Sequence, residues 1–163
     1  MIPSFPPTII LRHRKENLKK CSLRGLEERD DMLFFRYPIP DFGDIDFNKY
    51  VLLSLDGEEL SEKDGDKGVV LIDGTWRYAQ KMVENTTEFR DIPRRRLPEG
   101  YTTAYPRCQT ECPDPEAGLA SVEALYVAYS ILGRDTTGIL DNYHWKKAFL
   151  KKNAALLLGS GLA

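Results

Sequence analysis

The strongest hydrophobic run in the chain lies near its middle. Residues 69–72 are four consecutive apolar residues, three of them β-branched, and they lead straight into Asp73 and Gly74. A run of this kind predicts a strand that is buried on both faces, because a half-exposed strand would alternate apolar and polar residues. Small molecules bind beyond the carboxyl ends of the strands in open α/β sheets, so Asp73 stands at a candidate ligand site.

A helix is predicted directly after this strand. Thr75 can cap its first turn. Trp76, Ala79 and Met82 then follow at helical spacing, with polar residues between them. The predicted unit is a strand, a turn and a helix, with Asp73 and Trp76 at its ligand-facing end.

The rest of the chain alternates short apolar runs with polar segments. Strands are predicted over residues 8–11, 32–37, 50–55 and 101–105, and helices over residues 121–132 and about 135–153. Residues 56–67 are rich in Asp, Glu and Gly, and this composition predicts a surface loop. Strands that alternate with helices predict an α/β fold, with a mainly parallel sheet flanked by helices. A chain of 163 residues is expected to form a single domain, residues 1–163.

The charge distribution is uneven although the net charge is only −2. Residues 12–29 carry seven lysines and arginines against three acids, whereas residues 41–66 carry nine acids against two lysines. A local basic patch can bind nucleic acid whatever the net charge, and an ordinary solvated surface is the alternative. No apolar run approaches the roughly 20 residues that span a bilayer. Three cysteines, an odd number, fit a reducing cytoplasmic compartment.

The sequence predicts no metal site. Cys108 and Cys112 are separated by three residues, but no second close pair accompanies them. Structural zinc sites need four ligands at suitable spacing, so buried free thiols are the better interpretation. Glycine-rich phosphate-binding motifs are also missing from the sequence.

Four motifs together resemble the DTW-domain family. Residues 73–76 (Asp-Gly-Thr-Trp) match its D-x-T-W signature, and residues 96–98 and 118–124 follow in the order of the family. Residues 19–22 (Lys-Lys-Cys-Ser) and 144–150 further resemble the branch that modifies small-subunit ribosomal RNA.

The resemblance implies an S-adenosylmethionine-dependent transferase that donates the 3-amino-3-carboxypropyl group to a uridine or pseudouridine in RNA, with small-subunit rRNA as the expected substrate. It also implies a fold similar to the SPOUT methyltransferases. An N-terminal α/β part would reach about residue 67, and a cofactor-binding part with a C-terminal trefoil knot would follow. The expected partner is RNA, with no membrane association, and the chain is expected to be a monomer that acts in ribosome biogenesis.

The chemistry gives Asp73 a candidate catalytic role. A uracil ring nitrogen must lose its proton as it attacks the sulfonium-activated carbon, so a nearby carboxylate could accept that proton. The alternative for Asp73 is a turn carboxylate that satisfies backbone N–H groups. Trp76 likewise has two interpretations: it packs in the core, or it lines the cofactor pocket.

The resemblance also implies two sets of binding residues. The cofactor-binding set is Ser22, Ile72, Asp73, Trp76, Tyr101, Ala117, Leu119, Ala120 and Ser121. The RNA-binding set is Arg12, Arg14, Lys19, Lys20, Arg24, Arg94, Arg95, Arg96, Lys146 and Lys147.

Some features depart from the ribosomal branch, and other functions stay open. Residues 101–106 replace a segment that usually contains Ala-Asn-Pro, and Ala120 stands where serine is common. The alternatives are a tRNA-uridine aminocarboxypropyltransferase, a SPOUT-type RNA methyltransferase and a non-catalytic RNA-binding assembly factor. The absence of a cysteine-rich start weakens the tRNA alternative.

Overall fold

The computed structural model describes residues 5–13, 23, 25–38, 41–73, 76–104 and 119–159. For residues 76–78 and 158–159 it describes the backbone alone. No helix in these segments is long and apolar enough to cross a membrane.

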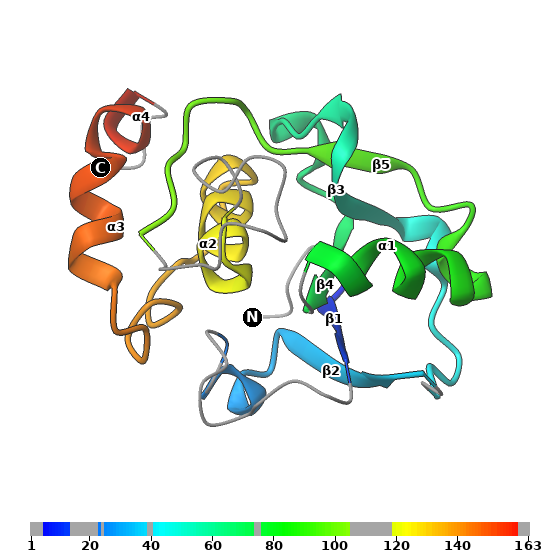
Figure 1. The fold of residues 1–163 in the computed structure, drawn as a ribbon. Coiled ribbons are helices and arrows are strands. Elements are labelled where there is room, and N and C mark those ends of the chain that lie inside the picture. Colours follow the sequence, from blue (N-terminus) through cyan, green and yellow to red (C-terminus); the bar gives the residue numbers. More distant parts are fainter. Residues whose placement is uncertain are drawn as a thin grey trace.

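A parallel sheet of five strands forms the centre of the fold (Figure 1). The strands are β1 (Thr8–His13), β2 (Met32–Tyr37), β3 (Tyr50–Glu59), β4 (Gly68–Asp73) and β5 (Arg94–Arg96). Their order across the sheet is β2-β1-β4-β3-β5, and each adjacent pair is parallel. The predicted α/β fold with a mainly parallel sheet is confirmed, and β4, the hydrophobic run of the sequence, is its central strand.

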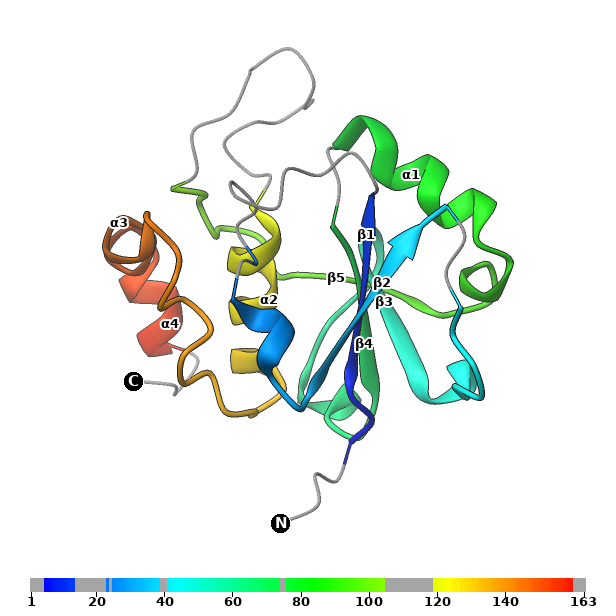
Figure 2. The ribbon, with the colours of Figure 1, turned by 90° about the horizontal axis from the view of Figure 1, so that it is seen from below.

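Helices cover both faces of the sheet (Figure 2). On one side lies α1 (Trp76–Asn85). On the other lies α2 (Ser121–Ile131), with α3 (Lys146–Lys152) and α4 (Ala154–Gly159) outside it. Short 3-10 turns are η1 (Leu26–Glu28), η2 (Phe47–Lys49), η3 (Glu62–Asp64) and η4 (Thr87–Phe89).

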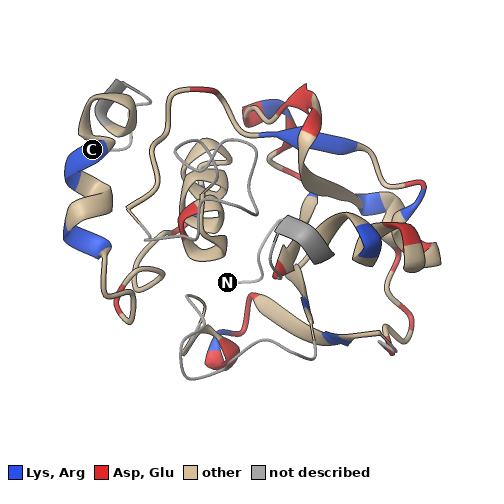
Figure 3. Ribbon diagram, in the orientation of Figure 1, with Lys and Arg blue, Asp and Glu red and all other residues tan. Residues whose placement is uncertain are grey.

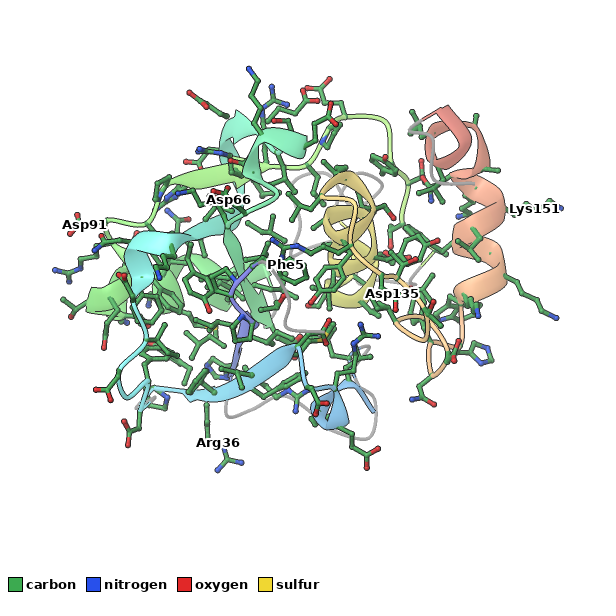
Figure 4. All side chains as sticks on the ribbon, turned by 180° about the vertical axis from the view of Figure 1, so that it is seen from behind. Phe5, Arg36, Asp66, Asp91, Asp135 and Lys151 are labelled. Atoms are coloured by element: carbon green, nitrogen blue, oxygen red, sulfur yellow. The ribbon has the colours of Figure 1, made fainter. Side chains whose placement is uncertain are left out.

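The two faces of β4 belong to different parts of the core. Val70 packs in a cluster with Met82 of α1 and Phe89 of η4, whereas Leu71 packs in a cluster with Leu125 of α2. Burial on both faces explains why β4 is a continuous apolar run rather than an alternating one. In Figure 4, Arg36 and Lys151 point outward.

The predicted loop over residues 56–67 is wrong in its first part. Strand β3 continues to Glu59 and pairs with β5, after an irregularity in register between Leu53 and Glu58. Gly57 has a φ of 93°, and a side chain there would collide with the carbonyl of Arg94. Glycine therefore lets the two backbones approach.

The predicted strand over residues 101–105 is also wrong within its described part, since residues 101–104 are in no strand. The place beside β3 belongs to Arg94–Arg96 instead. Backbone groups of residues 102–104 bond to side chains from α2 and from the end of α3, so they need no neighbouring strand.

The long helix predicted over about 135–153 is confirmed only at its end. Residues 134–145 form turns and irregular backbone, and α3 begins at Lys146. Two glycines with positive φ, Gly133 (73°) and Gly138 (84°), redirect the chain. Ile139, Leu140 and Tyr143 are buried as a helical face would be, but they reach the core from turns.

Candidate active site

Asp73 joins three elements at the carboxyl end of β4. Its residue is only 3% exposed. Arg12, its register neighbour in β1, donates from Nε to Oδ2 at 3.1 Å. Ser121, the first residue of α2, donates from Oγ to Oδ1 at 2.9 Å. The carboxylate therefore fixes the amino end of α2 against the edge of the sheet.

Arg12 is itself held from several sides. Its Nη1 lies 3.3 Å from Oε2 of Glu27 in η1, and its guanidinium lies 4.7 Å from the centre of the Phe34 ring. Burial raises the pKa of Glu27, but backbone hydrogen bonds of Glu27 and Gly25 and the Arg12 guanidinium together lower it below its ordinary value. A charged Glu27 keeps Arg12 aligned with Asp73.

A second carboxylate, that of Glu123, organises the start of α2 from within. Ala120 precedes the helix and has no side-chain oxygen with which to cap it. The Glu123 carboxylate instead accepts the N–H of Ala120 at 2.8 Å, as in the return half of a capping box. Glu123 is fully buried, and it also binds Thr103, Ala104 and Tyr143.

The segment 101–104 runs between α2 and α3 (Figure 1). The buried side chain of Asn153 accepts the N–H of Thr102 at 2.7 Å and donates to its carbonyl at 2.8 Å. Lys152 donates to the carbonyl of Thr103 at 3.3 Å. Side chains of Asn153 and Glu123 thus hold this segment in the way that a neighbouring strand would.

The structure brings several of the predicted cofactor residues together. Asp73 and Ser121 are in direct contact, with Ile72 beside them in β4 and partly buried. Tyr101 and Ala120 are buried and belong to the two segments that Glu123 connects. Leu119 is partly buried, and Trp76 begins α1, with its side chain not described; Ser22 and Ala117 lie outside the described residues.

The sequence did not identify three residues that hold the site together. Arg12 was predicted to bind RNA, but the structure places it against Asp73. Glu123 and Asn153 were not singled out. A signal existed for Glu123, because it is the third residue of a predicted helix, where glutamate commonly bonds back to the preceding N–H.

The described candidates for RNA binding are mostly near acids. Arg94 lies 3.3 Å from Asp56, and Arg95 lies 3.3 Å from Asp64. The remaining pairs are Arg96 with Glu59 at 3.8 Å and Lys146 with Asp141 at 3.1 Å. Lys147 is exposed, while Arg14, Lys19, Lys20 and Arg24 lie outside the described residues. Strand β5 and helix α3 lie on opposite sides of α2 (Figure 3).

Within the described segments, no group of three or more His, Cys, Asp or Glu side chains could hold a metal ion. The described polar groups at the site are carboxylates, hydroxyls, backbone groups and the side chains of Arg12, Lys152 and Asn153.

The fold and this site define a parallel α/β protein with a candidate small-molecule site at the carboxyl edge of its central strand. The DTW domain family model matches residues 3–152, and the chain belongs to that family. The predicted family resemblance is confirmed.

A solved structure similar to this chain is that of the SAM-dependent rRNA:acp-transferase Tsr3 from Vulcanisaeta distributa. The TM-score is 0.70 and the sequence identity 22%, over 94% of this chain and 82% of that chain. At this identity the likeness shows a shared fold. No curated protein matches the sequence.

Proposed function

We propose that this protein transfers the 3-amino-3-carboxypropyl group of S-adenosylmethionine to a uridine or pseudouridine in RNA, and that small-subunit rRNA is its substrate. The observation that carries the proposal is the hydrogen bond between Asp73 and Ser121. It joins the D-x-T-W segment of a DTW-domain chain to the start of α2, at the edge of the sheet where α/β proteins bind small molecules. The shared fold with an rRNA:acp-transferase supports it.

The described residues fit S-adenosylmethionine by their chemistry. The cofactor combines an adenine ring, a positive sulfonium and an amino acid. Ile72 and Leu119 offer partly buried apolar surface, and Asp73 offers a negative charge. Ala120 is small enough for a ligand to approach the backbone, and Ser121 offers a hydroxyl. Tyr101, Trp76, Ser22 and Ala117 complete the proposed binding set.

When bound, the cofactor supplies a carbon activated by its sulfonium; the chain must orient the two reactants and receive a proton. We assign the proton to Asp73. Both of its carboxylate oxygens accept hydrogen bonds in the structure, from Arg12 and from Ser121. To act as the base, Asp73 must therefore exchange the Ser121 hydroxyl on Oδ1 for the ring N–H of the substrate.

RNA binding is assigned to the basic side chains around the site. The exposed Lys147 and the segment that carries Arg14, Lys19, Lys20 and Arg24 are the main phosphate contacts in this proposal. Arg94, Arg95, Arg96 and Lys146 each lie near an acid, so they would have to exchange that partner for phosphate. Phosphate contacts make affinity fall steeply with salt.

The proposal includes the finer features expected from the sequence. These are a SPOUT-like trefoil knot in the C-terminal part, a monomeric state and a cytoplasmic location. Analytical ultracentrifugation tests the monomer, and an experimental structure with bound cofactor tests the knot.

Mass spectrometry of nucleosides tests the function. Ribosomal and transfer RNA are compared between cells with and without the protein. We expect an aminocarboxypropylated uridine or pseudouridine in small-subunit rRNA of cells that contain the protein. This nucleoside should be missing when the gene is deleted and should reappear when the unmodified protein is expressed again. Loss of this nucleoside from tRNA instead would identify the tRNA enzyme, and loss of a methylated nucleoside would identify a methyltransferase.

A further inference from the structure

We propose that Glu123 is a positioning residue that holds the two described segments of the cofactor site, residues 101–104 and 119–121, in one fixed arrangement. The inference rests on the proposed function, because it takes these segments to contact S-adenosylmethionine. It goes beyond that function by assigning a role to a buried residue that touches neither reactant.

The contacts of Glu123 come from three separate parts of the chain. Oε1 accepts the N–H of Ala120 at 2.8 Å and the hydroxyl of Thr103 at 2.6 Å. Oε2 accepts the N–H of Ala104 at 2.8 Å and the hydroxyl of Tyr143 at 2.9 Å. The carboxylate therefore links the start of α2, the segment 101–104 and the turn that precedes α3.

A carboxylate suits this place because it is an acceptor on both oxygens. Glutamine of the same size carries an NH₂ group in place of one oxygen, and that group would face two donors. Buried donors without a partner are costly, so the segments would move apart to reach other acceptors. The fully buried charge also lies in the first turn of α2, where the helix dipole favours a negative group.

Three groups that donate to Glu123 belong to the segments of the cofactor site. Glu123 therefore positions these segments in addition to stabilising the core. Ala120 is adjacent to Ser121, which bonds to Asp73. The segment 101–104 has no neighbouring strand, so its position depends on Glu123 at one end and on Asn153 at the other. A shift at Glu123 would therefore reach the cofactor site directly, although Glu123 is 0% exposed.

A matched pair of tyrosine variants tests the inference. Tyr143→Phe removes the hydroxyl that binds Glu123. Tyr129→Phe removes a buried hydroxyl that bonds to Thr8 at 2.7 Å and donates to Oδ2 of Asp31 at 3.3 Å, at the other end of the sheet. Tyr129→Phe should lower Tm at least as much as Tyr143→Phe does, so a cofactor affinity weakened only in Tyr143→Phe reports position and not stability.

The measurements are calorimetric titration with S-adenosylmethionine and hydrogen exchange of the Ala104 and Ala120 amides. For Tyr143→Phe we expect an affinity about three- to tenfold weaker and faster exchange at both amides, since one lost hydrogen bond near 1 kcal/mol corresponds to such a factor. Glu123→Gln should weaken binding by about tenfold or more. Tyr129→Phe should bind as the unmodified protein does.

The outcomes are distinct. Equal affinities and equal exchange in Tyr143→Phe, Tyr129→Phe and the unmodified protein would overturn the positioning role and leave the proposed function intact. An unmodified protein that binds no S-adenosylmethionine would overturn both. Tyr143→Phe keeps the test decisive if Glu123→Gln does not fold.

Discussion

The two faces of the sheet are built differently. On the α1 face, aromatic side chains pack together: the Phe89 ring lies 5.4 Å from that of Phe42 and 5.7 Å from that of Phe47, centre to centre. On the α2 face, polar side chains are buried among the apolar ones. Glu123 and Asn153 hold the segment 101–104, and Tyr129 bonds to Thr8.

Arg134 shows the same use of polar groups at the amino end of the strands. It is buried, donates to the carbonyls of Gly65 and Lys67, and stacks at 3.8 Å on the Phe5 ring. Burial lowers the pKa of Arg134. Its contacts, like those of Glu123, reach segments that lie outside the strands.

The difference indicates what each face contributes. On the α1 face, the segments that carry Phe42, Phe47 and Phe89 lie outside the strands, and the packing of their rings fixes their place. On the α2 face, the segment 101–104 is also held by hydrogen bonds to buried side chains, because an unpaired buried polar group is costly. We infer that the α1 face mainly supplies stability, and that the α2 face also fixes the geometry of the candidate site.

The largest effect is expected from Asp73→Asn, at the edge between the faces. The change keeps the size of the side chain but removes the base, so turnover at saturating cofactor should fall by about 10²–10⁴-fold. Cofactor affinity should fall less, because the NH₂ group of asparagine would face the donor of Arg12 or of Ser121. Part of the activity should return as pH rises, because hydroxide can replace the base. The measurement is the single-turnover rate at saturating cofactor across a pH series; a rate near that of the unmodified protein at neutral pH would end the general-base role.

Phe89→Ala should have the largest effect on stability alone. Removing this ring from the α1 face should cost about 3–5 kcal/mol of unfolding free energy, while the folded protein binds S-adenosylmethionine normally. Denaturant unfolding and calorimetry measure the two quantities. Leu55→Ala, at a side chain that is 75% exposed, is the control and should change little. Weaker cofactor binding by folded Phe89→Ala would contradict the inference that the α1 face mainly supplies stability.

Asn153→Ala should lower the stability of the fold and also loosen the segment 101–104, because Asn153 holds that segment on the α2 face. The loss of its hydrogen bonds should cost about 1–3 kcal/mol and speed hydrogen exchange at Thr102. Hydrogen exchange of the β4 amides should become faster only by the amount that the lower unfolding free energy accounts for. Unchanged exchange at Thr102 in the variant would show that the segment is held by other contacts.

The smallest effect is expected from Arg94→Ala. The side chains of Arg94 and Asp56 are 42% and 66% exposed, and such pairs contribute about 0–1 kcal/mol. Unfolding free energy at low and high salt is the measurement. A loss well above this range would mean that the β3–β5 extension depends on its ion pairs.

Local hydrophobic patterns predicted the strands and the helix whose buried residues are apolar and regularly spaced. Strand β2 was predicted with the observed bounds, and β4 and α2 were found from apolar runs and helical spacing. Strand β5 was missed because its three arginines carry no apolar signal; it pairs with β3, which supplies the acids opposite. Residues 101–104 have the composition of a strand but find their partners in side chains of distant residues.

The candidate site was predicted in part. Asp73 and Ser121 came from the family motifs, and their contact joins residues 48 apart in the chain, which no local pattern contains. Glu123 looks like a surface residue because charge normally indicates exposure. Its burial depends on donors from three segments that meet only in the folded chain.

The most direct measurement identifies the product that the cofactor leaves behind. The unmodified protein is incubated with S-adenosylmethionine and small-subunit rRNA lacking the modification, and the small molecules are separated by mass. Transfer of the aminocarboxypropyl group predicts methylthioadenosine in equal amount to the modified nucleoside, with Asp73→Asn strongly impaired. Release of S-adenosylhomocysteine would show methyl transfer instead. RNA binding without either product would contradict the enzymatic account.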